Sequence, residues 1–450
     1  MSLEPVIQYL YHHKEKSAAV SLLETMHRHA FSFEEYDDLS KCAFRIKEYQ
    51  LAIEYGEEAL TTAYANEKMW AARTNLINVY NHANYPEKAL RLIRANEVTI
   101  PNDADTRLEK AFSLYLLGRR DEAEALLRKE LERDDLTEEV RTKIVFNLGT
   151  YELYRDNFNK GLTLFLIEGQ TLNFWKKPTL PGELWDGQEA PGRSILVYAE
   201  AGIGDEIINV RFLKHLQRRG LKPTWYTDRP DMANIFRASG FEVITQMKHR
   251  PPGSLWTHSM AVPTYLKLDH PDLWDGPYLK TVPEFDEKWR KEITQKPRLK
   301  VGLRWQGNPE YDHDLHRSVP LDMIMSALPS PRDDKLALYS LQRDTGLEEL
   351  ETHCDVVDLS SRLVTFEDTL SAINLLDVII TSCTSIAHAA AALGKRTYIF
   401  APLSAYYTWS HSMKQSPWYG DNVTLLRQVR PRVWDEPIAE LKELLASREL

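Results

Sequence analysis

Hydrophobic and polar residues follow two different patterns along the 450-residue chain. Up to about residue 175, apolar residues recur at helical spacing and glycine and proline are sparse, which predicts an all-helical region. From residue 195 onward, short apolar runs such as SILVYAE (194–200) alternate with amphipathic helical segments. This alternation predicts parallel sheets with helices on both faces.

The helical region contains a repeat. A small residue followed by an apolar run recurs at spacings of 33, 37, 34 and 38 residues, at Ala19, Ala52, Ala89, Ala123 and Gly161. A period of this length is typical of tetratricopeptide-like helix pairs, in which the small residue lets the two helices pack closely. A generic helical bundle is the alternative. We predict a repeat domain over 1–175 with a groove and no catalytic cluster.

The remaining chain divides into four segments. A linker over 176–194 is rich in proline and glycine, and the charged stretch 281–298 separates two strand–helix series. Strands are expected at 194–200, 222–228, 241–246, 299–305, 335–342, 355–360, 377–382 and 396–402, and helices at 205–219, 230–239, 320–328, 366–376 and 384–393. We therefore expect two Rossmann-like domains, 195–295 and 296–430, and a C-terminal helix over 431–450. Ligands of such folds bind at the carboxyl ends of the strands.

Composition narrows the class of protein. The three cysteines, Cys42, Cys354 and Cys383, show no metal-ligand spacing, so neither a disulfide framework nor structural zinc is expected. No apolar run approaches the roughly 20 residues of a membrane span, and the N-terminus lacks the order of a signal peptide. We expect a cytoplasmic protein. The net charge of −10 argues against a nucleic-acid partner, and a homo-oligomer is compatible with the sequence.

A carboxylate follows a glycine turn in YAEAGIGDEII (198–208). The turn consists of Gly202, Ile203 and Gly204, and Asp205 comes next, at the start of the expected helix. Asp205 is either a helix cap or a general base. A dinucleotide-binding oxidoreductase is disfavoured, because the third glycine of its motif would fall on Ile207 and Asp205 would face the pyrophosphate.

The second half carries a candidate anion site. Thr384 and Ser385 open a helix after a strand, and His388 lies one turn further along the same face. Free N–H groups and the helix dipole favour an anion there, although an ordinary hydroxyl cap gives the same pattern. Arg304 and Arg317 bracket a long polar loop and could offset a diphosphate, unless both are solvated surface arginines. Within that loop, Asp312-His313-Asp314 resembles a metal-binding triplet, a pattern also common in ordinary loops.

Seven sequence blocks occur in order over residues 160–430. They are LPGELWDG (180–187), EAGIGDEIINVRFL (200–213), VGLRWQGNP (301–309), HRSVPL (316–321), LYSLQ (338–342), TFEDTLSAINLLDVIITSCTSIAHAAAALG (365–394) and SPWYGDNVTLLRQ (416–428). Together they resemble tetratricopeptide-repeat glycosyltransferases of the GT-B type, relatives of the heptosyltransferases and distant relatives of O-GlcNAc transferase.

The resemblance implies a role for each candidate residue. Asp205 would take the proton of the acceptor hydroxyl, and the acceptor-side turn would be Gly202, Ile203 and Gly204. The donor nucleotide-sugar would contact Thr384, Ser385, His388, Arg317, Arg304, Gln342, Phe366, Asp368 and Cys383. Cys383 stands where the family has an acid that touches the donor sugar, so this chain departs from the pattern there.

These implications define the expected activity. We expect an inverting glycosyltransferase that needs no metal or other cofactor, with a nucleotide-sugar as donor. Its acceptor would be a protein or peptide held by the repeat groove, or a glycan or lipid-linked sugar. The alternative is a repeat scaffold with a degenerate transferase domain that binds nucleotide without turnover, which the change to Cys383 favours.

Overall fold

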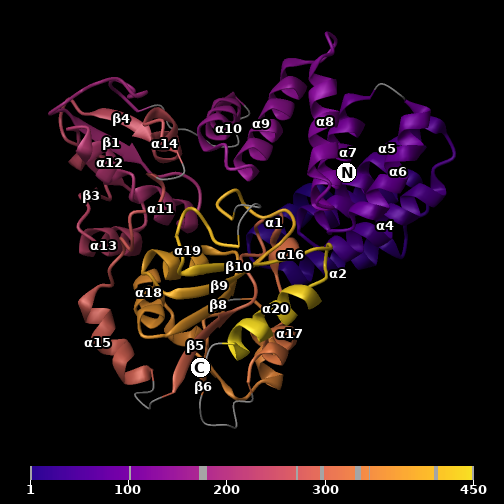
Figure 1. The fold of residues 1–450 in the computed structure, drawn as a ribbon. Coiled ribbons are helices and arrows are strands. Elements are labelled where there is room, and N and C mark those ends of the chain that lie inside the picture. Colours follow the sequence, from indigo (N-terminus) through magenta and orange to yellow (C-terminus); the bar gives the residue numbers. More distant parts are fainter. Residues whose placement is uncertain are drawn as a thin grey trace. The chain divides into compact units, whose positions relative to one another are not determined.

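The computed structural model describes residues 3–100, 103–171, 180–269, 272–293, 298–329, 336–343, 345–409 and 414–447. The chain forms two compact units. The first contains Met1–Ile144 together with the short segments Asn308–His316 and Val429–Val433. The second contains Val145–Gly307, Arg317–Gln428 and Trp434–Leu450. Figure 1 labels the helices and strands of both units.

The first unit consists of helices that pack on their neighbours in sequence. They are α1 (Glu4–His12), α2 (Lys16–His27), α3 (Phe33–Arg45), α4 (Tyr49–Thr62), α5 (Asn66–His82), α6 (Pro86–Thr99), α7 (Ala104–Leu116) and α8 (Arg120–Leu131). The repeated small residues of this unit have no exposed surface: Ala19, Ala52, Ala89 and Ala123. Their burial agrees with the prediction that a small residue in the second helix of each pair allows close packing.

The turn inside each helix pair has the same unusual backbone. Five residues before each repeated small residue, φ is positive: at Lys14, Lys47, Asn84, Gly118 and Asp156 it is 63°, 62°, 62°, 73° and 62°. A left-handed conformation costs a residue with a side chain on the order of 1 kcal/mol. Only the fourth of these turns uses glycine, so residue type alone does not reveal the repeated turn.

The second unit begins within the helical region. Its first elements are the end of α9 (Glu138–Tyr154) and α10 (Phe158–Thr171). A Cβ at Gly161 would lie 2.7 Å from the backbone nitrogen of Leu153, so the two helices approach as the repeat predicts. The Phe158 ring packs edge-on against Trp418, at 5.8 Å between centroids. The last helix pair of the predicted repeat domain is thus part of the α/β unit. Residues 176–179 of the predicted linker lie outside the described residues.

The first sheet of this unit has four parallel strands in the order β3-β2-β1-β4. They are β1 (Ser194–Tyr198), β2 (Lys222–Tyr226), β3 (Val243–Ile244) and β4 (Leu255–His258). The accompanying helices are α11 (Ile203–Val210), α12 (Leu213–Arg218), α13 (Pro230–Ala238) and α14 (Val262–Tyr265). Strand β4 was not predicted from the sequence, because Thr257 and His258 interrupt its apolar run. The single helix expected over 205–219 is two helices.

The second sheet has six parallel strands in the order β10-β9-β8-β5-β6-β7. They are β5 (Leu299–Arg304), β6 (Leu336–Ser340), β7 (Val356–Asp358), β8 (Val378–Ser382), β9 (Arg396–Ala401) and β10 (Val423–Arg427). Its neighbouring helices are α15 (Pro283–Glu292), α17 (Leu321–Ala327), α18 (Phe366–Asn374), α19 (Ser385–Ala392) and α20 (Asp435–Ala446), and the short helix α16 (Asp314–Arg317) belongs mostly to the first unit. Strand β10 and helix α15 were not expected from the sequence. The predicted fold class, helical repeats followed by two Rossmann-like parallel sheets, is confirmed.

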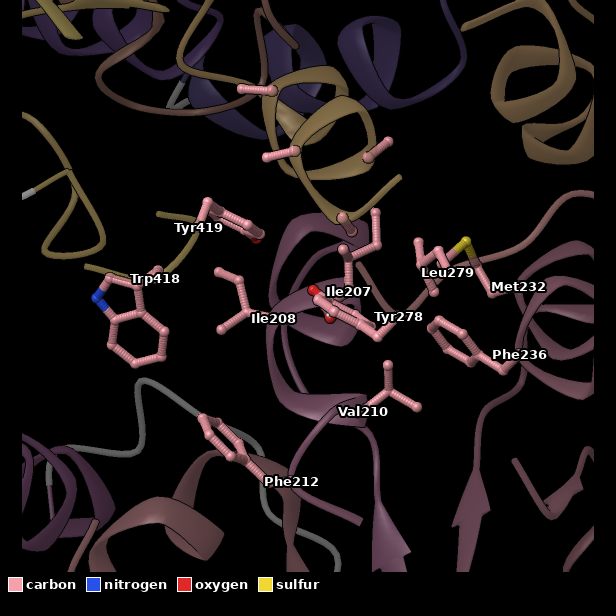
Figure 2. Close-up of a cluster of buried hydrophobic side chains, with 14 of the residues drawn as sticks. Ile207, Ile208, Val210, Phe212, Met232, Phe236, Tyr278, Leu279, Trp418 and Tyr419 are labelled. Atoms are coloured by element: carbon pink, nitrogen blue, oxygen red, sulfur yellow. Dashed lines mark hydrogen bonds between the residues drawn. The ribbon is translucent and has the colours of Figure 1, made fainter. Parts of the chain in front are cut away.

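One hydrophobic core extends through the helices of both sheets. Figure 2 shows Ile207 and Ile208 of α11 between Tyr278 on one side and Trp418 and Tyr419 on the other. Tyr278 donates a hydrogen bond from its hydroxyl to the Ile207 carbonyl at 2.8 Å. Because this core is continuous, the two sheets of the second unit are held in a fixed relation by packed side chains.

Arg211 is the polar centre of this core. Its guanidinium lies 4.4 Å from the ring centroid of Tyr278 and 4.7 Å from that of Tyr419. It donates to the carbonyls of Leu273 and Trp418 at 2.8 and 2.5 Å. A buried cation needs such partners, and a charge left without them would be strongly destabilising. Arg211 also marks the break between α11 and α12.

In the part of the chain that the structure describes, every helix is too short or too polar to cross a lipid bilayer.

Candidate functional site

The order of strands gives the second sheet a position where parallel sheets commonly bind ligands, called here the crevice. Strand β5, the first of its series, lies between β8 and β6, so the direction of chain progression reverses between β5 and β8. Ligands of open parallel sheets bind at the carboxyl ends of the strands beside such a reversal. Arg304 ends β5 in register with Thr381 of β8, and the turn into α19 follows directly. The candidate donor residues Arg304, Thr384 and Ser385 therefore lie at this crevice.

The start of α19 combines backbone donors with a neighbouring guanidinium. Thr384 is the N-cap, and its hydroxyl accepts a hydrogen bond from the Ile386 nitrogen at 3.3 Å. Arg317 donates to the Cys383 carbonyl at 2.9 Å, which brings its positive charge to this turn. Arg304 donates to the Leu341 carbonyl at 2.9 Å. The ordinary hydroxyl cap, which the sequence left open as the alternative to an anion site, is present at Thr384. The same turn also has the features of an anion site.

His388 is buried behind this turn. Its Nδ1 lies 2.8 Å from the Tyr419 hydroxyl, and its ring stacks on Trp409 with 4.5 Å between centroids. Burial, with the positive charges of Arg211 and Arg317, lowers the pKa of His388 to about 3. The imidazole is therefore neutral at physiological pH and adds no charge to the crevice.

The glycine turn of the first sheet meets this histidine. A Cβ at Gly204 would lie 3.0 Å from Cδ2 of His388 and 3.8 Å from Cα of Ser385. Gly204 thus lets α11 approach the start of α19 at a distance that a side chain would disturb. Gly204, a predicted residue of the acceptor-side turn, is therefore in contact with Ser385 and His388, two predicted residues of the donor side.

Asp205 uses both of its carboxylate oxygens. Oδ2 accepts a hydrogen bond from the Gly202 nitrogen at 3.1 Å, which is the capping contact. Oδ1 accepts a hydrogen bond from the Tyr406 hydroxyl at 3.0 Å. Burial raises the pKa of Asp205, although both hydrogen bonds act in the opposite direction. A carboxylate whose proton affinity is raised by its surroundings is suited to accept a proton.

Three of the candidate donor residues have structural partners. Gln342 has no exposed surface, and its Oε1 accepts hydrogen bonds from the nitrogens of Trp305 and Gln306 at 3.3 and 3.1 Å. Asp368 caps α18 and accepts a hydrogen bond from Nζ of Lys288 at 2.6 Å, a contact that lowers its pKa against the effect of burial.

Phe366 begins α18, and its backbone nitrogen donates to Asp231 of α13 at 3.1 Å. This contact and those of Asp368 and Gln342 join elements of the fold.

The polar loop between Arg304 and Arg317 has a function that the sequence did not reveal. Its central segment, Asn308–His316, is part of the helical first unit. Asp312 forms an ion pair with Lys47, and the His313 ring lies 5.7 Å from both His82 and Phe112. The Asp312-His313-Asp314 triplet therefore packs on helix ends, and the described residues contain no group of three or more side chains suited to hold a metal.

Several residues near the carboxyl edges of the two sheets were not predicted from the sequence. Tyr406, Trp409 and Tyr419 lie in the connection between β9 and its neighbour β10. Glu200 and His258 lie at the carboxyl edge of the first sheet, with Nδ1 of His258 3.0 Å from Oε1 of Glu200. The aromatic residues looked like core positions, and Glu200 stood unremarked in the same block as Asp205.

Comparisons with known proteins concern the fold. No family model and no curated protein matches the chain. Similar solved structures include a glycosyl transferase family 9 protein from Veillonella parvula (10% identity, 54% of this chain and 88% of that chain, TM-score 0.39). E. coli ADP-heptose LPS heptosyltransferase II is 12% identical over 56% of this chain and 98% of its own (TM-score 0.38). A mutant O-GlcNAc transferase from Thermobaculum terrenum is 14% identical over 92% of each chain (TM-score 0.35). All three TM-scores lie below 0.5.

Proposed function

We propose that the protein is an inverting glycosyltransferase that moves a sugar from a nucleotide-sugar donor to an acceptor hydroxyl. The observation that carries the proposal is the contact of Gly204 with the His388 ring and Ser385. This contact supports the proposal, because Asp205, the candidate base on the first sheet, is next to Gly204, and the start of α19 on the second sheet is the candidate anion site.

The chemistry divides between the two sheets. The acceptor oxygen attacks the anomeric carbon of the donor sugar while the bond from that carbon to the phosphate oxygen breaks. Asp205 accepts the proton of the acceptor hydroxyl. The bond's electron pair leaves with the nucleoside diphosphate, whose charge Arg304, Arg317 and the N–H groups of α19 stabilise. A single displacement inverts the anomeric configuration.

We further propose that these cationic side chains and the helix terminus perform the electrostatic role that a metal ion performs in other transferases. The acceptor would be a protein or peptide, or a glycan. The proposed location is the cytoplasm.

The test combines binding with turnover. Wild-type protein should be stabilised against heat by nucleoside diphosphates or their sugar conjugates, because a ligand that binds only the native state raises its stability. Asp205→Asn should retain this binding and lose about 10²- to 10⁴-fold in the rate of nucleotide release with acceptor. Arg317→Ala should weaken binding. Arg218→Ala, which removes an exposed ion pair with Asp275, is the matched control. Unchanged turnover in Asp205→Asn would refute the role of Asp205 as base.

A second candidate function is a scaffold that binds nucleotide without turnover. The observation that favours it is Cys383, whose carbonyl accepts from Arg317 at a position where the resembled family has an acid. Nucleotide binding without nucleotide release from any common sugar donor would support this second function over the first.

A further inference from the structure

The first sheet has its own reversal in strand order. Strand β1 lies between β2 and β4, so the direction of chain progression reverses between β1 and β4. Because open parallel sheets bind ligands beside such a reversal, the carboxyl ends of β1 and β4 are a second candidate ligand position. Glu200 follows the end of β1, and His258 is the last residue of β4.

These two side chains form a buried pair. Nδ1 of His258 lies 3.0 Å from Oε1 of Glu200, and the side chains are 8% and 7% exposed. Oε2 of Glu200 accepts a hydrogen bond from the Met260 nitrogen at 3.4 Å. The hydroxyl of Ser259, the residue after His258, is buried and has no hydrogen-bond partner among the described residues. Buried polar groups are normally satisfied, so this end of β4 has unused hydrogen-bonding capacity.

Aromatic rings continue from this pair across the sheet. Tyr198 is in register with Tyr226 of β2 and with His258 of β4. The two tyrosine rings stack with centroids 5.0 Å apart and an interplanar angle of 24°. Both tyrosines are half-buried, whereas the alternate positions of β1, Ile195 and Val197, belong to the hydrophobic core. The tyrosines therefore lie on the face of the sheet opposite that core.

The charges around the tyrosines are negative. Burial, followed by the neighbouring Tyr226 and by the acids Asp228 and Glu200, raises the pKa of Tyr198. Arg229 is the nearest basic residue in sequence to Asp228, and it pairs with Glu206 instead. An anionic ligand would be repelled here, whereas a ligand with neutral hydroxyl groups could donate hydrogen bonds to the carboxylates.

We propose that Tyr198, Glu200, Tyr226 and His258, the switch-point cluster, bind a neutral saccharide as the acceptor. The ring's C–H face would lie on the tyrosines, and its hydroxyl groups would bond to Glu200 and His258. This inference rests on the proposed function and selects a glycan over a peptide as acceptor. An aromatic surface with a few convergent polar groups is the usual composition of a small-molecule site.

The proposal is tested by direct binding, without turnover. The probes are the methyl glycosides of glucose, galactose, mannose and N-acetylglucosamine, with glucose 6-phosphate as the anionic comparison, observed by saturation-transfer NMR on the full chain. At least one neutral glycoside should bind, and glucose 6-phosphate should bind at least tenfold more weakly. Glu200→Gln, which keeps the size of the side chain, and Tyr198→Leu should each weaken that binding at least tenfold.

Two control variants separate the cluster from general effects. Glu242→Gln changes an exposed acid at the opposite end of the sheet, and Tyr64→Leu changes an exposed ring in the first unit. Both should bind as the wild type does, and melting temperatures should show that all variants are folded. Equal binding by the controls and the cluster variants would overturn the proposal.

Failure of this inference differs from failure of the proposed function. Wild-type protein that binds nucleotide but none of the neutral glycosides, or that glycosylates a peptide equally well with Glu200→Gln, would overturn the saccharide assignment alone. Saccharide binding at the cluster without any nucleotide binding would support the site and contradict the transferase.

Discussion

The hydrogen bond between Tyr406 and Asp205 gives the sharpest test of the candidate base. The Tyr406 hydroxyl donates to Oδ1 of Asp205 at 3.0 Å, and both residues are half-buried. A hydrogen bond to a charged group contributes about 1.5–3 kcal/mol to stability. We therefore expect Tyr406→Phe, which removes only the hydroxyl oxygen, to destabilise the protein within this range.

A double-mutant cycle isolates this one contact. The free energy of unfolding is measured by urea denaturation for the wild type, Tyr406→Phe, Asp205→Asn and the double variant. The second unit carries both residues, so its transition is the one to follow. A coupling energy of about 1–3 kcal/mol is expected, because each single change already removes the charged hydrogen bond. Additivity within 0.5 kcal/mol would refute the contact as a source of stability.

The same variant predicts a change in the pH–rate profile. The phenol stabilises the ionised form of Asp205, so its loss raises the pKa of that carboxyl. The acidic limb of kcat/KM should move to higher pH in Tyr406→Phe, because the base must be deprotonated to act. Tyr64→Phe is the control, because it removes a hydroxyl from an exposed ring of the first unit. A shift of equal size in Tyr64→Phe would show that the effect does not belong to the hydroxyl of Tyr406.

Three further predictions follow from the described contacts. Because burial raises the pKa of Asp205 above its value in the unfolded chain, its ionisation costs stability as pH rises through the folded pKa; Asp205→Asn should therefore increase the urea midpoint at pH 8 more than at pH 4. Burial lowers the pKa of His316 from 6.5 to about 4, so the contribution of the neutral imidazole to the free energy of unfolding is complete above pH 6.5. This contribution should fall by about 2 kcal/mol by pH 5, and His316→Asn should flatten this part of the pH–stability curve. Gly204→Ala places a Cβ 3.0 Å from the His388 ring and should cost about 1–3 kcal/mol, whereas Gly202→Ala meets only a carboxylate oxygen at 3.4 Å and should change the melting temperature little.

Local patterns predicted most of the fold. The repeated alanines were recognisable because one small residue per helix pair recurs at nearly constant spacing, and all four in the first unit are fully buried. Strands with continuous apolar runs, such as Val378–Ser382, were placed within a residue. The short strand Leu255–His258 was missed because its pairing with β1, and not its own composition, makes it a strand.

The loop between Arg304 and Arg317 shows what a local pattern leaves undetermined. Its length and polarity predict a functional loop, and the two flanking arginines predict a nearby diphosphate, but neither pattern indicates the partners of the loop's central segment. Asp312 pairs with Lys47, 265 residues earlier in the chain, and the His316 ring lies 3.1 Å from the carbonyl of His82. Partners this distant in sequence leave no trace in the spacing of the loop itself, so the sequence alone could not distinguish a docking segment from a ligand-binding one.

Asp205 can serve both as a helix cap and as a general base in this geometry, although the sequence presented these two roles as alternatives. The capping contact uses Oδ2, and because the Gly202 nitrogen is fixed by the turn, it restricts the rotation of the carboxylate. Oδ1 is then directed away from the helix, to a hydroxyl that comes from 201 residues further along the chain. A base held in one rotamer needs no reordering before it accepts a proton, which lowers the entropic part of the barrier. The cap thus supplies the orientation that the proposed chemistry requires, and the Tyr406 hydroxyl marks the side from which an acceptor hydroxyl would approach.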